Sequence, residues 1–189
     1  MTDKEIVEAI VEKNNHDAFR ELLSRYQRMV ITTCVGFTGS YEDAEDIAQD
    51  VFIELFESIA SFRNESKLST WIYRIAVNKS LNFIRKRKRE ALFSSLGLKK
   101  SEQGKALVDT LEVELDSNVE DHILSNEKKM LLRKAIYSLP ENQKTAMILS
   151  KYQELSYKEI SEVMGVSVSS VESLLFRART TLKKVFSEK

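Results

Sequence analysis

Glycine and proline are scarce in this chain, and their scarcity limits the folds that it can adopt. The 189 residues include five glycines and one proline, which is low against average usage. Both residues interrupt regular helices, so a chain with so few of them favours long helices and an all-α fold. The glycines mark breaks at three places: Gly36 and Gly39, Gly97 and Gly104, and Gly165.

Apolar residues recur at spacings of three and four, which is the periodicity of an amphipathic helix. The pattern predicts helices over about 6–15, 17–35, 42–61, 67–89, 125–139, 142–152, 157–164 and 168–186. The segment 91–124 has a weak apolar pattern and seven acidic residues against three lysines, which is typical of a flexible acidic linker. We therefore expect two small helical domains, 1–90 and 125–189, joined by the linker 91–124.

Several protein classes are excluded by simple features of the sequence. No apolar run is long enough to cross a bilayer, and the N-terminal residues lack the apolar core of a signal peptide. Cys34 is the only cysteine, so no intramolecular disulfide can form. We expect a cytoplasmic protein without membrane insertion, in which Cys34 is a small buried hydrophobe rather than a reactive thiol.

The formal net charge is zero, but the charges are strongly segregated. Residues 41–61 contain seven acidic side chains and no basic one, whereas residues 62–89 contain nine basic side chains and one acidic one. Such asymmetry between adjoining segments indicates two different partners, one of them an anionic polymer.

The C-terminal part carries the signals of a helix-turn-helix. Ser156 and Glu159 form a capping box at a helix start, Gly165 breaks that helix, and Ser167 can cap the next one. Five apolar residues fall where a helix-turn-helix needs them to pack its two helices together: Ile160, Met164, Val166, Val171 and Leu174.

The helix beginning near Ser167 is expected to turn a polar face outward, and Phe176 lies on that face. A phenylalanine in such a place needs a reason, and packing on a thymine methyl in the major groove supplies one. The alternatives are a helical pair without DNA, or a Phe176 that packs on a neighbouring domain. The candidate DNA-contacting residues are Ser167, Ser169, Ser170, Glu172, Ser173, Phe176, Arg177, Arg179 and Lys183.

Four acidic residues share one narrow face of the helix predicted over 42–61: Asp43, Asp46, Asp50 and Glu54. Three interpretations stay open. The face is simply solvated, it holds a divalent metal, or it docks on a basic protein partner. A second acidic helix and well-placed histidines are missing, since His16 and His122 lie far from the face in sequence. The prediction is therefore no metal and no cofactor, with docking favoured.

The helix predicted over 67–89 combines an indole, amides and guanidiniums on one strip: Trp71, Arg74, Asn78, Asn82 and Arg85. Such a strip suits phosphate contacts together with stacking on unpaired bases. It continues into five consecutive basic residues, 85–89, which again indicate an anionic partner. The alternative for Trp71 is that it belongs to the core.

Together these segments resemble bacterial RNA polymerase sigma factors. Residues 43–52 and 62–78 are similar to sigma region 2, and residues 139–143, 157–160 and 176–179 are similar to region 4. The short chain, with a linker where larger members carry region 3, resembles the extracytoplasmic-function (ECF) subfamily of the sigma-70 family.

The resemblance implies a non-enzymatic protein without catalytic residues that binds promoter DNA and the clamp helices of the largest RNA polymerase subunit. It implies polymerase contacts by Asp43, Asp46, Gln49, Asp50, Phe52 and Glu54. It implies −10 recognition and assistance in melting by Arg63, Asn64, Ser66, Lys67, Trp71, Arg74, Asn78, Lys79, Asn82 and Arg85. The helix from Ser167 is expected to recognise the −35 element. An anti-sigma partner is a further implication, and a free-standing helix-turn-helix regulator is the alternative function.

The resemblance departs from the family's usual residues at three places. Many members carry glycine and threonine where this chain has Ser169 and Ser170, a basic residue in place of Glu172, and arginine in place of Leu174. The resemblance therefore implies the role of this helix rather than the usual −35 sequence.

Overall fold

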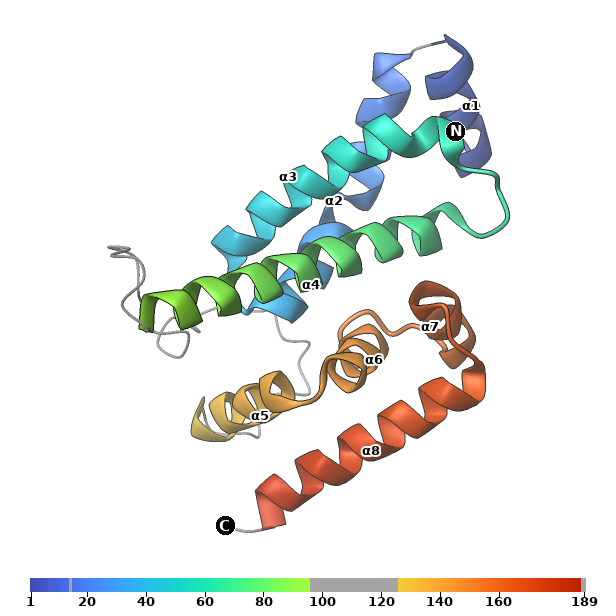
Figure 1. The fold of residues 1–189 in the computed structure, drawn as a ribbon. Helices are drawn as coiled ribbons and strands as arrows, with labels where there is room; N and C mark the ends of the chain where they lie inside the picture. The colour runs from blue at the N-terminus through green and yellow to red at the C-terminus, as the bar shows by residue number, and fades with distance from the viewer. Residues whose placement is uncertain (14, 96–125, 188–189) are drawn as a thin grey trace. The chain divides into compact units, whose positions relative to one another are not determined.

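A computed structural model describes residues 1–13, 15–95 and 126–187, and these residues form two compact all-helical units (Figure 1). The first unit contains α1 (Asp3–Lys13), α2 (His16–Thr38), α3 (Tyr41–Ser58), the 3-10 helix η1 (Ile59–Ser61) and α4 (Leu68–Ser95). The second contains α5 (Asn126–Ser138), α6 (Glu141–Lys151), α7 (Tyr157–Met164) and α8 (Val168–Ser187). The predicted all-α class is confirmed.

The core of the first unit lies between α2, α3 and α4, which pack against one another. Its centre is filled by fully buried aliphatic side chains, among them Leu22, Val30, Val51, Leu55 and Ile72. Cys34 lies in this core with 0 % exposure, as predicted, and burial raises the pKa of its thiol to about 11. The sulfur is therefore a packing atom here and not a nucleophile.

The chain breaks between α2 and α3 as predicted, but the break begins at Gly39 rather than at Gly36, because α2 continues through Gly36 to Thr38. Val35 and Phe37 on either side are both buried. Their packing outweighs the cost of about 1 kcal/mol for a glycine inside a helix. The helix ends instead at Gly39, whose φ of 71° is left-handed and whose N–H donates to the Val35 carbonyl at 2.8 Å.

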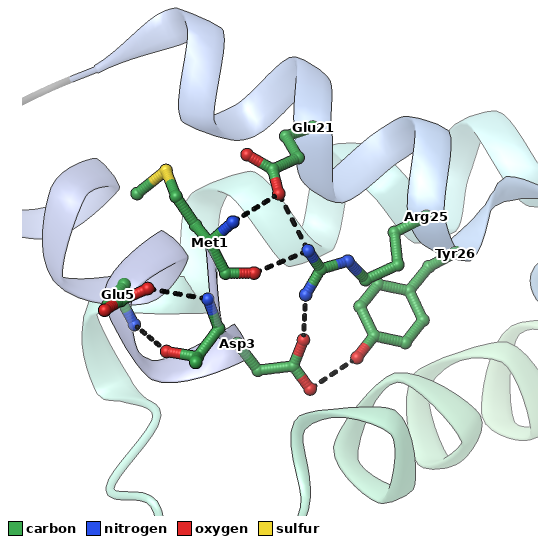
Figure 2. Close-up of polar contacts among 7 residues, drawn as sticks. Met1, Asp3, Glu5, Glu21, Arg25 and Tyr26 are labelled. Atoms are coloured by element: carbon green, nitrogen blue, oxygen red, sulfur yellow. Dashed lines mark hydrogen bonds and ion pairs between the residues drawn. The ribbon is translucent and has the colours of Figure 1, made fainter.

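A polar network fixes α1 on α2 (Figure 2). The Arg25 guanidinium donates to Asp3 Oδ1 and to Glu21 Oε1, each at 2.7 Å. The Tyr26 hydroxyl donates to Asp3 Oδ2 at 2.6 Å. Burial, followed by this hydrogen bond to Asp3, raises the pKa of Tyr26 above its usual range. One carboxylate of α1 is thus bound by two neighbouring residues of α2.

The helix α4 is longer than its sequence pattern indicated. It was expected to end at Arg89, but it continues to Ser95, so the first five residues of the predicted linker are helical. The remainder of that predicted linker, 96–124, lies outside the described residues.

The second unit is built around α8, which packs against α5, α6 and α7. The predicted capping box is confirmed: Ser156 Oγ accepts from the Glu159 N–H at 3.3 Å, and Glu159 Oε2 accepts from the Ser156 N–H at 3.1 Å. Gly165, with φ of 65°, ends α7, and the turn leads directly into α8. The helix-turn-helix is thus formed by α7 and α8.

Four of the five apolar positions predicted for this motif are at least half-buried, and Ile160 and Val171 are fully buried. Val166 is the exception, with 37 % exposure. It directly follows the left-handed Gly165, and its N–H donates to the Ser161 carbonyl at 3.1 Å. This turn geometry leaves the Val166 side chain partly in solvent.

Candidate nucleic-acid interface

One face of α8 is buried and the opposite face is open to solvent. Val171, Leu175 and Ala178 are buried against the rest of the unit. Phe176 points the other way, with 70 % of its surface exposed. The outward face has a shallow hollow lined by Glu172, Ser173, Phe176 and Arg177. It therefore joins an aromatic ring, a carboxylate, a hydroxyl and a guanidinium.

Three exposed serines gather at the amino end of α8. Ser167 Oγ accepts from the Ser170 N–H at 3.2 Å and lies 3.0 Å from Ser169 Oγ and 2.8 Å from Ser170 Oγ. The serine cap holds the hydroxyls at a helix start, where backbone N–H groups and the helix dipole favour negative charge. This arrangement suits phosphate contacts.

The arginines of α8 differ in their surroundings. Arg177 is exposed beside Phe176, whereas the Arg179 guanidinium donates to the Tyr157 hydroxyl at 3.2 Å. Arg179 thus links α8 to α7 across the turn. Sequence reasoning missed this link, because the spacing of one helix does not report a contact 22 residues away.

On α4 the predicted strip is present: Arg74, Asn78, Asn82 and Arg85 are all exposed. Trp71 at its start is half-buried and stacks on Phe62, with 5.1 Å between ring centroids and 29° between ring planes. Trp71 is therefore neither fully buried in the core nor fully exposed to solvent. The intervening loop contains Asn64, which has a positive φ of 56°.

The four acidic residues on this face of α3 fall into two groups. Asp46 and Asp50 are exposed. The two ends of the face contact α4 instead: Asp43 Oδ2 lies 2.6 Å from Arg87 Nη1, and Glu54 Oε2 lies 2.8 Å from Lys79 Nζ.

The hydrogen bond to Glu54 raises the pKa of Lys79. Lys79, predicted among the DNA-contacting residues, thus lies beside the acidic face of α3. Neither cross-helix ion pair was apparent from the separate helical patterns.

The outer surface of α3 also exposes apolar side chains beside the acids. Ile53 is 56 % exposed and Phe56 is 44 % exposed, and Phe56 packs edge-on against Phe19 with 4.9 Å between ring centroids. Gln49 is exposed and Phe52 is half-buried. Ile53 and Phe56 were missed, although both fall outside the buried stripe of α3, which was a usable signal.

Two further properties concern the described part of the chain alone. Over residues 1–13, 15–95 and 126–187, no group of three histidine, cysteine or acidic side chains is arranged to hold a metal ion. None of the helices in those ranges has the length and apolar character needed to cross a membrane.

Two protein families match this chain. Residues 22–90 match sigma-70 region 2, and residues 129–182 match sigma-70 region 4. The ECF RNA polymerase sigma-E factor of Haemophilus influenzae is 34% identical over 183 residues, covering 97% of this chain and 94% of that protein. The sigma-E factor of Escherichia coli is also 34% identical, covering 96% and 93%. The RNA polymerase sigma-H factor of Pseudomonas aeruginosa is 32% identical, covering 96% and 92%.

Solved structures show the same fold. CnrH, in complex with the cytosolic domain of CnrY, has a TM-score of 0.66 at 20% identity, covering 97% of both chains. The sigma factor RpoE of Bartonella quintana, in complex with the anti-sigma factor NepR, has a TM-score of 0.62 at 22% identity, covering 89% of this chain and 96% of that chain. With both sigma-70 regions matched and relatives of more than 30% identity over nearly the whole length, the chain belongs to the ECF sigma factors of the sigma-70 family, non-enzymatic proteins that direct RNA polymerase to promoters.

Proposed function

We propose that this sigma factor divides its work among three surfaces, α3 for polymerase, α4 for the −10 element and α8 for the −35 element. The observation that carries the proposal is that side chains of different chemical types are exposed on different helices. Exposed carboxylates lie on α3, and exposed donors with an aromatic ring lie on both α4 and α8. The protein would act in the cytoplasm, where polymerase and promoters are found.

The polymerase contact is assigned to Asp43, Asp46, Gln49, Asp50, Phe52 and Glu54 of α3. Asp46 and Asp50 offer exposed carboxylates to the clamp helices of the largest polymerase subunit. Ile53 and Phe56 add apolar area that a partner can cover. Charge complementarity sets the orientation of such a complex, and burial of apolar side chains supplies affinity.

The −10 contact is assigned to the strip on α4 and to the loop before it: Arg63, Asn64, Ser66, Lys67, Trp71, Arg74, Asn78, Lys79, Asn82 and Arg85. The Phe62–Trp71 stack provides an aromatic surface next to exposed amides and guanidiniums. An unpaired base gains about 1–3 kcal/mol from aromatic stacking. Contacts of this kind offset the lost base stacking, so promoter melting is assisted by binding alone.

The −35 contact is assigned to α8, inserted into the major groove of duplex DNA. Contacts to phosphates would position the helix, and they would come from Lys183 and from the serines 167, 169 and 170. Glu172, Ser173, Phe176 and Arg177 would face base edges, with Arg179 supporting the turn through Tyr157.

At the domain level, residues 1–90 would form the unit for polymerase and the −10 element, and residues 125–189 the unit for the −35 element. Residues 91–124 would be an acidic flexible connection between them. An anti-sigma factor is a further proposed partner, supported by the complexes of CnrH with CnrY and of RpoE with NepR.

The test is run-off transcription with purified core polymerase on a pool of genomic promoter fragments, with and without this protein. New protein-dependent transcripts, lost when Asp46 and Asp50 are both changed to lysine, support the assignment of α3. Transcripts that persist with this variant would refute the docking role. Retention of duplex DNA without any transcript would favour a free-standing regulator instead.

A further inference from the structure

Glu172 is the only acidic residue of α8, and it lies on the outward face of that helix. Its side chain is exposed and lines the hollow that also contains Phe176 and Arg177. A negative charge is unexpected on a surface proposed to approach a polyanion, because it opposes phosphate binding. It therefore needs an explanation of its own.

The fold itself makes no visible use of Glu172. Helical partners lie three or four residues away, and those positions hold Val168, Ser169, Leu175 and Phe176, none of which is basic. The helix is already capped by Ser167. Among the described residues, no hydrogen bond or ion pair engages the Glu172 carboxylate.

The chemistry of the major groove limits what a carboxylate can bind. A carboxylate only accepts hydrogen bonds, so it is repelled by phosphates and by the acceptor edges of guanine and thymine. Adenine offers an amino group with the acceptor N7 beside it, whereas cytosine presents its N4 amino group as its only polar major-groove atom. Cytosine is thus the base edge that suits Glu172.

We infer that Glu172 is a specificity-determining residue that selects a cytosine in the −35 element. This inference rests on the proposed −35 role of α8. Phe176 lies one helical turn further along the same face, about 6 Å away along the axis. Base pairs are stacked about 3.4 Å apart. The cytosine is therefore expected within about two base pairs of a thymine whose methyl group contacts Phe176.

The experiment uses holoenzyme reconstituted from the full chain and core polymerase. The promoter carries a fixed −10 element and a randomised −35 region, and sequences of the transcribed templates are compared between variants. Wild-type protein is expected to enrich cytosine at one position by about tenfold. Glu172→Ala should lose this preference at that position and keep the base preferences elsewhere.

Two further variants sharpen the test. Glu172→Gln should move the preference from cytosine toward adenine, because a glutamine amide pairs with adenine N6 and N7. Glu154→Ala removes an exposed acid from the turn before α7 and should leave every preference as in the wild type. Circular dichroism on each variant checks that the helices are retained.

Three results would overturn the inference. They are no cytosine preference in the wild type, an unchanged preference in Glu172→Ala, or an equal gain for all templates in Glu172→Ala, which indicates repulsion of phosphates alone. If the wild type transcribes promoters but selects no −35 base at all, the −35 assignment of α8 fails first and the inference fails with it.

Discussion

The ammonium of Lys79 on α4 lies 2.8 Å from a carboxylate oxygen of Glu54 on α3. A second pair, Arg87 with Asp43, joins the same two helices at 2.6 Å. The basic helix therefore partly neutralises the acidic one within the free protein. Asp46 and Asp50 remain the exposed carboxylates between these pairs.

A double-mutant cycle of Glu54→Gln and Lys79→Gln should give a coupling energy of about 0.2–1 kcal/mol, because both side chains are partly exposed. The coupling is measured from urea unfolding and should fall at high salt. It should also disappear at high pH. The pKa of Lys79 is raised, so its contribution is present below the ordinary lysine pKa and is lost as the pH rises through the folded value. The control is Lys86→Gln, which changes an exposed lysine further along α4. It takes the place of Lys79→Gln in a second cycle with Glu54→Gln.

Changing Asp46 and Asp50 together to lysine should weaken binding to core polymerase by at least about 100-fold, because like charges placed opposite each other cost several kcal/mol. Fluorescence anisotropy of labelled protein measures the affinity. The matched control is Glu8→Lys with Glu12→Lys, two exposed acids on α1. Equal losses in both double variants would contradict a specific docking face.

Trp71 is the only tryptophan, so its fluorescence reports on the stack with Phe62. Phe62→Ala should shift the emission to longer wavelength, increase quenching by acrylamide and cost at least about 0.5–1.5 kcal/mol of stability, since burial of the ring is lost together with the stack. Phe93→Ala removes an exposed aromatic of α4 and should change neither spectrum nor quenching. An unchanged spectrum for Phe62→Ala would mean that the stack does not persist in solution.

Substitutions of Arg177 and Arg179 should affect different properties, DNA binding for Arg177 and stability for Arg179. Arg177→Ala is expected to weaken −35 binding by about 1–3 kcal/mol, mostly for one base identity, with little change in unfolding. Arg179→Ala removes the hydrogen bond to Tyr157 and should lower the stability of the second unit by about 0.5–1.5 kcal/mol. Competition binding with duplex variants and thermal unfolding distinguish the two. A loss from Arg177→Ala that is equal for all sequences would assign this residue to phosphate.

Cys34 should react slowly with thiol reagents until the first unit unfolds. Its pKa rises from 9.0 to about 11, so the thiolate fraction near neutral pH falls about 100-fold from ionisation alone. Burial of the sulfur slows the reaction further. Labelling rates in native buffer and in denaturant provide the comparison. Rapid labelling of the native protein would show that the core around Cys34 opens readily.

The helices and their caps were predictable because their signals are local. The Ser156–Glu159 capping box and the stop at Gly165 depend on residues within one turn, and both were correct. The outward face of α8, with Phe176 on it, followed from periodicity alone.

The features that sequence reasoning missed depend on contacts between distant residues. Gly36 stays helical because its neighbours are buried by other helices. The pairing of Lys79 with Glu54 and of Arg179 with Tyr157 requires knowing how two helices are aligned. The partial exposure of Val166 was not predicted, because the turn geometry after Gly165, and not helical spacing, decides it.

The left-handed end of α2 also has a kinetic consequence. Only Gly39 and Ser40 separate α2 from α3, and these two helices pack directly on each other. Short connections keep contacts local, and chains dominated by local contacts fold within microseconds to milliseconds. We therefore expect the α2–α3 hairpin to form early and to present a ready surface on which α4 completes the unit.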